Sequence, residues 1–173
     1  MDYSLLGFSG LKEFFNLHPM FVHFPIALIP SALLLYGLGI AFRNRALNIA
    51  GRACLNLAAA GTTVAVATGL HAMETFPHND TIHHMALTHR TIALAVMVTL
   101  GVLFLWSFWQ TDQRPRAAWA FLVVLAFATI AVLQAADIGA RMVFVQGAAV
   151  RPAVSVIAPP DEIKEFEEHH RAE

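Results

Sequence analysis

Histidines are the residues of this chain best suited to chemistry, and most of them fall in its first half. The chain has 173 residues and nine histidines. Seven of the nine lie between positions 18 and 89, namely His18, His23, His71, His78, His83, His84 and His89. Neutral imidazole binds transition metals and haem iron, and it exchanges protons near neutral pH. The pattern therefore points to metal, haem or proton chemistry.

Four long apolar runs position these histidines. The chain is 57% hydrophobic and 13% charged, whereas soluble domains carry about a quarter charged residues. A spanning helix needs ~20 mostly apolar residues. Such runs cover about 21–42, 53–73, 91–110 and 117–136, and none has a Lys, Arg, Asp or Glu in its middle. The sequence predicts an all-α integral membrane protein. A net charge of −1 gives no general attraction to nucleic acid.

Short connections between the runs predict an up-down four-helix bundle. We expect one membrane domain over 1–150 and a tail over 151–173, acidic from 161. Short interfacial helices are expected at the ends, the first over the amphipathic residues 2–15. The connection over 74–90 is predicted to be a loop packed on the outer face. No internal sequence repeat is evident.

Arginines in the short loops predict the orientation. The first and third loops hold five of them, whereas Arg90 stands alone at the end of the middle connection; the five are Arg43, Arg45, Arg52, Arg114 and Arg116. Loops rich in Lys and Arg stay in the cytoplasm. Both termini and the histidine-rich connection are therefore predicted to lie on the outer, periplasmic side.

The same topology carries all seven histidines to one membrane face. His23, His71 and His89 touch the helices themselves, and ionisable groups at a membrane boundary mark candidate functional sites. Hydrogen bonding of these imidazoles to loops is the alternative. Chelation along one helix is disfavoured, because His18 and His23 are five residues apart and their rings point to different sides.

Haem b held between two helices is the cofactor that this arrangement favours. Bundle cores hold cofactors on facing helices, and the chain has no CxxCH motif for covalent haem. His23 and His89 are the predicted axial pair for haem iron, with His71 as the substitute. His18 ranks lower because it precedes Pro19 and is expected just outside the membrane. Arg90 is a candidate partner for a haem propionate, and Thr88 and Asp137 are candidates to orient the rings.

One stretch resembles a known family. Residues 18–28 read His-Pro-Met-Phe-Val-His-Phe-Pro-Ile-Ala-Leu, which resembles the opening signature of a bacterial four-helix membrane family known as domain of unknown function 2231. Gly69-Leu70, Thr88-His89-Arg90 and residues 137–150 are also similar to parts of that family. Some relatives are joined to Rieske or cytochrome c modules, which implies a redox setting in the bacterial inner membrane. This chain departs from many relatives in two places: it has His71-Ala72 where they have an acidic or aromatic pair, and Gln146 where they have histidine.

The residues and the resemblance together predict a membrane redox subunit. A b-type cytochrome would pass electrons between the quinone pool and a periplasmic cytochrome or another subunit of a redox complex. Two alternatives remain: a non-redox anchor or assembly subunit, and transition-metal handling at the outer face. No arrangement of nucleophile, base and orienting group is visible, so an electron-transfer subunit is favoured over a stand-alone enzyme.

Overall fold

The described part of the chain consists almost entirely of helices. The structure is a computed structural model, and it describes residues 17–75, 79–111 and 113–148. Its elements are α2 (His18–Phe21), α3 (His23–Ala41), α4 (Arg45–Thr75), α5 (Asp80–Phe108), the short strands β1 (Gln110–Thr111) and β2 (Arg114–Pro115), and α6 (Ala118–Phe144). Four helical stretches are long and apolar enough to cross a membrane, with α2 and α3 forming the first. The predicted all-α membrane bundle is confirmed.

The helices are longer than the apolar runs indicated. α4 begins at Arg45 because the Asn44 side chain accepts hydrogen bonds from the backbone N–H groups of Ala46 and Leu47, at 2.9 and 3.2 Å. α5 begins at Asp80 because the Asn79 side chain accepts one from Ile82 N–H at 2.9 Å. Asparagine is a favoured N-cap for this reason. The expected bounds at 53 and 91 were therefore wrong by two to three turns.

α6 also runs beyond its predicted end at 136 and stops at Phe144. Gly147 follows with a φ of +68°, and its N–H donates to the Val143 carbonyl at 3.0 Å. A glycine in this left-handed conformation is a common helix terminator. The predicted loop over 74–90 was likewise wrong, since residues 80–90 are the first turns of α5. The predictions for residues 2–15 and for the acidic tail lie outside the described residues.

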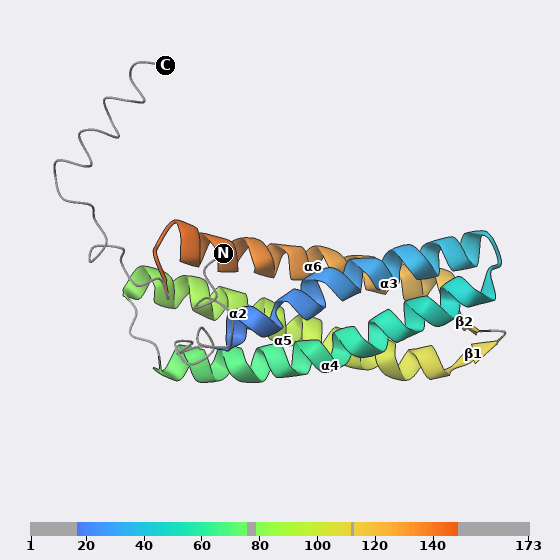
Figure 1. Cartoon of the computed structure of the whole chain (residues 1–173), viewed down its shortest axis with the longest axis horizontal. Coiled ribbons are helices and arrows are strands. Elements are labelled where there is room, and N and C mark those ends of the chain that lie inside the picture. Colours follow the sequence, from blue (N-terminus) through green and yellow to red (C-terminus); the bar gives the residue numbers. More distant parts are fainter. Residues whose placement is uncertain (1–16, 76–78, 112, 149–173) are drawn as a thin grey trace, which may run out of the picture.

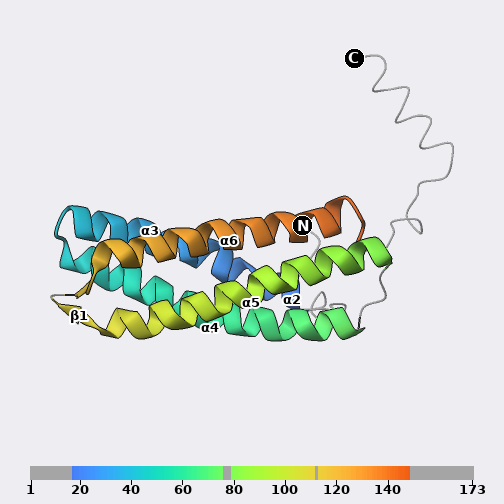
Figure 2. The same ribbon diagram turned by 180° about the vertical axis from the view of Figure 1, so that it is seen from behind.

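The helices form one elongated bundle in which sequential neighbours are antiparallel (Figure 1). Around the bundle the packing order is α3, α4, α5, α6, and α6 closes the ring against α3. α3 and α5 are therefore diagonal partners, as are α4 and α6. Figure 2 shows the bundle from behind, with α5 and α6 nearer the viewer than α3 and α4. One end carries α2, the start of α5 and the ends of α4 and α6; we call it the histidine end.

The opposite end carries the α3–α4 turn and the β1–β2 hairpin, and we call it the hairpin end. Trp106 Nε1 donates to the Arg116 carbonyl at 2.9 Å, and the Arg116 guanidinium lies 5.4 Å from the centre of the Trp109 ring. Trp119 is exposed on α6. Tryptophans gather where a bilayer meets water, so these three mark one membrane boundary.

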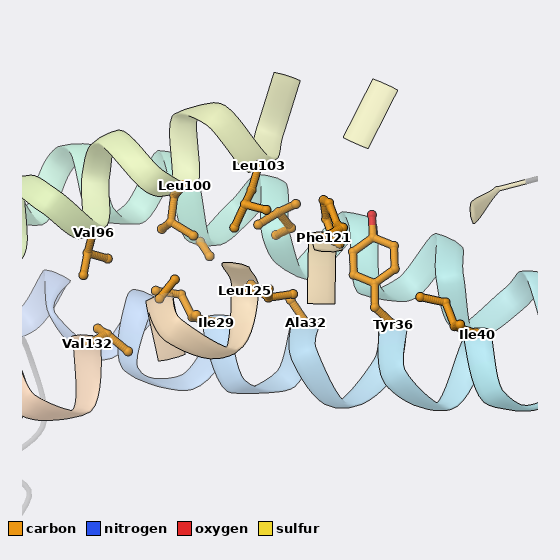
Figure 3. Close-up of a cluster of buried hydrophobic side chains, with 13 residues drawn as sticks. Ile29, Ala32, Tyr36, Ile40, Val96, Leu100, Leu103, Phe121, Leu125 and Val132 are labelled. Atoms are coloured by element: carbon orange, nitrogen blue, oxygen red, sulfur yellow. The ribbon is translucent and has the colours of Figure 1, made fainter. Parts of the chain in front are cut away.

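The core runs along the bundle axis and is mainly apolar. It is formed by buried aliphatic and aromatic side chains from all four long helices, including Ile29 and Tyr36 of α3, Leu55 of α4, Leu100 of α5, and Phe121 and Leu125 of α6. Figure 3 shows side chains of α3, α5 and α6 converging on this axis. The outward faces expose large apolar residues such as Leu34, Val98 and Phe127, as lipid-facing surfaces do.

Candidate histidine site

His18 lies inside the bundle rather than outside it. It opens α2 and is half-buried. Its Nδ1 lies 2.8 Å from the carbonyl oxygen of Ala65 on α4 and 3.5 Å from the hydroxyl of Thr68. A carbonyl oxygen only accepts, so Nδ1 carries the proton, and Nε2 of the neutral ring carries the lone pair. His18 therefore packs within the bundle, and its predicted place just outside the membrane stays a prediction.

His89 is held in the same way by the other pair of helices. It lies on α5 and is half-buried. Its Nδ1 donates to the carbonyl oxygen of Ala135 on α6, at 2.9 Å. Its ring orientation and tautomer are therefore fixed by main chain, as those of metal-binding histidines usually are. The predicted orienting residues Thr88, Arg90 and Asp137 do not make these bonds.

The two rings meet between the two helix pairs. Their centres are 6.0 Å apart, and the ring planes make an angle of 88°. His18 comes from the α2–α4 side and His89 from the α5–α6 side. Two imidazoles from different helices, each fixed through Nδ1, thus converge inside the histidine end.

A glycine lies beside each ring. A Cβ added at Gly69 would be 2.8 Å from Cε1 of His18, closer than real side chains approach, and one added at Gly139 would be 3.6 Å from Cε1 of His89, an ordinary contact. Gly69 is therefore required for the position of His18. At both positions the lack of a side chain leaves space beside the imidazole ring.

The other predicted site residues lie apart from this pair. His23 is exposed, and its Nδ1 is 3.4 Å from the carbonyl of Met20, one turn earlier. His71 is exposed on α4, and Arg90 is exposed on α5. The structure therefore brings His89 together with His18, and not with His23 or His71. The physical reason is rotation: five residues separate His18 from His23, so only one of them can face the interior.

Two more of the described histidines lie at this end. His83 and His84 are exposed on the first turns of α5, with ring centres 6.3 Å apart, and His78 lies outside the described residues. Within the described part of the chain, no group of three or more His, Cys, Asp or Glu side chains is placed to hold a metal ion. Among the described residues, the His18–His89 pair therefore offers two ligands of these types.

The pair lies close to one membrane boundary and below the rim of the bundle. A hydrocarbon core of about 30 Å corresponds to ~20 helical residues. Counted from Trp119 along α6 and back from Trp106 along α5, this length reaches the neighbourhood of Gly139 and His89. α5 and α6 both continue nine residues past the pair, from His89 to Asp80 and from Ala135 to Phe144, which is about 14 Å of helix.

These features define a class: a multi-pass four-helix membrane bundle with an internal histidine pair near one face. The family model described as a predicted membrane protein, DUF2231, matches residues 15–152. The chain belongs to this family, and the predicted resemblance is confirmed. No curated protein and no solved structure matches the chain.

Sequence reasoning missed the partner of His89, although a signal was present. The five-residue spacing that excluded chelation along one helix also implies that His18 and His23 face opposite ways. Reading that spacing together with Gly69, which clears the space for a ring on α4, would have favoured His18. His18 ranked low because the first apolar run begins at about residue 21, whereas the helix that carries His18 begins at His18 itself.

Proposed function

We propose that this protein is a membrane redox subunit that holds haem b between His18 and His89. The observation that carries the proposal is the pair itself: two half-buried imidazoles from different helices, each fixed by Nδ1 to a main-chain carbonyl, with centres 6.0 Å apart. In such rings Nε2 is the nitrogen with the lone pair that a metal takes.

The separation of the rings suits a shared metal centre. Two imidazoles on opposite sides of one metal ion have ring centres about 6 Å apart, because each metal–nitrogen bond is about 2 Å. Perpendicular planes are compatible with this arrangement, since each ring can turn about its own metal–nitrogen bond. The observed separation of 6.0 Å is close to this value, and the angle of 88° is compatible with it.

The number of ligands favours haem over a bare ion. Structural zinc sites are almost always four-coordinate, and the described residues offer no third His, Cys, Asp or Glu beside the pair. Haem iron brings four nitrogen donors of its own and needs only two axial ligands. Small residues border the rings, namely Ala65, Thr68, Gly69, Ala135 and Gly139, and they let a flat macrocycle approach. Bound haem would supply one-electron chemistry.

The place of the site suits electron exchange across a membrane boundary. The five loop arginines lie at the hairpin end, so the positive-inside rule puts that end in the cytoplasm and the histidine end in the periplasm. A haem there would lie between quinones dissolved in the bilayer and a periplasmic protein partner, in the inner membrane of a bacterium. Arg90 is exposed next to His89 and remains the candidate partner for a propionate.

A visible spectrum of the purified full-length protein tests the proposal. We expect a b-type reduced-minus-oxidised spectrum, and we expect His18→Ala and His89→Ala each to lose the low-spin signal. His23→Ala is the matched control, because it removes an exposed imidazole from the same end of the bundle. Wild-type protein that carries no haem when produced with ample haem supply would contradict the proposal.

One observation favours a second function, that of a non-redox anchor or assembly subunit. The His18–Ala65 bond joins α2 to α4, and the His89–Ala135 bond joins α5 to α6, so both histidines stabilise the bundle without any ligand. In that case His18→Ala and His89→Ala would lower the melting temperature of a protein that has no visible chromophore. A haem-containing wild type excludes this reading.

A further inference from the structure

The two histidines are held by the same local construction. His18 bonds to the carbonyl of Ala65, 47 residues later, and its ring lies against Gly69. His89 bonds to the carbonyl of Ala135, 46 residues later, and its ring faces Gly139. In both cases the accepting alanine and the glycine are four residues apart on one helix face. One two-helix unit therefore provides each imidazole.

The same correspondence extends along the first helix of each unit. His18 and His89 are 71 positions apart, and the same step carries buried residues of α3 onto buried residues of α5. The pairs are Pro25 with Val96, Ile29 with Leu100, Ala32 with Leu103, and Tyr36 with Ser107. These four are all the buried residues of α5, so the inward face of α5 repeats that of α3.

The second helices correspond with a step of 70 positions. Buried residues of α4 fall on buried residues of α6, in the pairs Gly51 with Phe121, Leu55 with Leu125, Ala58 with Ala128, Thr62 with Val132, and Ala65 with Ala135. Three of these pairs keep the residue type, and the next pair along, Gly69 with Gly139, keeps it as well. Buried residues three and four apart are expected on any helix of a bundle, so the correspondence depends on the shared His, Ala and Gly positions, with which the burial pattern agrees.

The packing order agrees with a two-fold relation. In the ring of four helices, α3 lies diagonally opposite α5, and α4 lies diagonally opposite α6. Each helix packs against its two neighbours in the ring. A half-turn about the long axis of the bundle exchanges the diagonal partners. The unit α2–α4 is thereby exchanged with the unit α5–α6, and His18 is exchanged with His89.

We infer that the chain is a tandem repeat of one two-helix unit, and that its site takes a metal centre coordinated by one imidazole from each repeat on equal terms. This inference rests on the proposed function of the site. It excludes a site in which one histidine binds the metal and the other acts as a proton acceptor. Haem iron with two axial imidazoles fits, and so does a copper(I) ion held linearly by two nitrogens.

Methionine substitutions in the full-length protein test the equivalence. His18→Met and His89→Met should each replace one axial imidazole by a thioether, which raises the reduction potential of haem. We expect both variants to show the same new spectrum and upward shifts that agree within about a factor of two. His23→Met and His71→Met are matched controls outside the pair and should leave spectrum and potential unchanged. A shift in one of the paired variants alone overturns the inference but leaves the haem proposal standing.

Two further measurements distinguish failure of this inference from failure of the proposed function. In His18→Gly and His89→Gly, added imidazole should restore the wild-type spectrum in both, a rescue that loss of folding would not permit. If the wild-type protein takes up no haem even with ample haem supply, it is titrated with copper(I) alone. One ion bound per chain, lost equally in His18→Ala and His89→Ala, would then uphold the equivalent pair although the haem proposal has failed. Binding of neither haem nor copper(I) would overturn both.

Discussion

The two repeats agree at the histidine end of the bundle and differ at the hairpin end. At the histidine end each repeat offers His, Ala and Gly at equivalent positions. At the hairpin end Tyr36 corresponds to Ser107, and Gly51 corresponds to Phe121. The large aromatic residue is thus on the first helix of one repeat and on the second helix of the other.

The volumes nevertheless complement one another at the hairpin end. The rings of Tyr36 and Phe121 pack edge to face with centres 5.0 Å apart, and Gly51 lies against the Tyr36 ring. The comparison indicates two kinds of constraint. Core packing requires only that the volume is filled, and many residue combinations achieve this. A ligand shared by both repeats requires the same side chain at the same position in each.

A second difference at the hairpin end concerns Asn48, whose equivalent is Ala118. Asn48 is buried, and neither polar atom of its amide has a hydrogen-bond partner. Its side chain lies directly against Gly39, where a Cβ would overlap it. Leaving a buried amide unpaired costs about 1–3 kcal/mol of folding free energy. Asn48 carries this cost, whereas Ala118 at the equivalent position does not.

The largest expected effect concerns the side of the membrane on which each end of the bundle lies. Reporter enzymes fused after Glu173, beyond the histidine end, should be active in the periplasm and inactive in the cytoplasm. Fusions at Asn44 in the α3–α4 turn should behave in the opposite way, because the loop arginines retain that end inside. Cytoplasmic activity of the fusion after Glu173 would reverse the orientation and put the histidine site on the inner face.

Truncation of the aromatic pair should have the next largest effect. Tyr36→Ala and Phe121→Ala each remove a buried ring, and each should lower the free energy of unfolding by about 3–5 kcal/mol. The double variant should lose less than the sum, because the two rings contact each other. Denaturant unfolding in detergent micelles measures this. Fully additive losses would show that the two repeats do not pack through this pair.

The two glycines should respond differently although they are equivalent. Gly69→Ala forces His18 to move, because the new Cβ would be 2.8 Å from its Cε1, and such overpacking costs about 1–3 kcal/mol. Gly139→Ala meets His89 at 3.6 Å and should be neutral or stabilising by up to about 1 kcal/mol, since alanine favours helix. Bound haem per chain and thermal unfolding report both. Equal loss in the two variants would contradict the difference in spacing.

The smallest effect is expected for Asn48→Ala, which makes the position like Ala118. It removes an unpaired amide, which is worth about 1–3 kcal/mol, but it leaves a small cavity of similar cost. We therefore expect a change in unfolding free energy within about 1 kcal/mol and an unchanged haem spectrum. A loss of 3 kcal/mol or more would mean that the amide makes an interaction that its surroundings do not reveal.

The sequence allowed the four crossings, their order and the gathering of histidines at one end to be predicted, because uninterrupted apolar runs and short links determine these features. It did not allow the helix ends to be predicted from hydropathy. Asn44 and Asn79 start their helices in polar segments outside the apolar runs, and N-capping by asparagine was the overlooked signal.

The repeat could not be recognised from residue types alone. Most equivalent pairs differ in identity, as Tyr36 and Ser107 or Thr62 and Val132 do, and share only burial. Burial depends on the neighbouring helices, which a single sequence does not reveal. The pairing of His18 with His89 is a property of this long-range arrangement, because it depends on the hydrogen bonds to Ala65 and Ala135 on the neighbouring helices.

The number of crossings in the repeated unit has a consequence for how such a protein can arise. A unit with two helices starts and finishes on one side of the membrane, so a second copy joined through the short α4–α5 connection inserts with the same orientation as the first. Its histidine then arrives at the same depth with no adjustment. A unit with an odd number of crossings would have been inverted on duplication, and its two imidazoles would face opposite compartments. Because the unit has an even number of crossings, duplication alone brings the two histidines to the same membrane face.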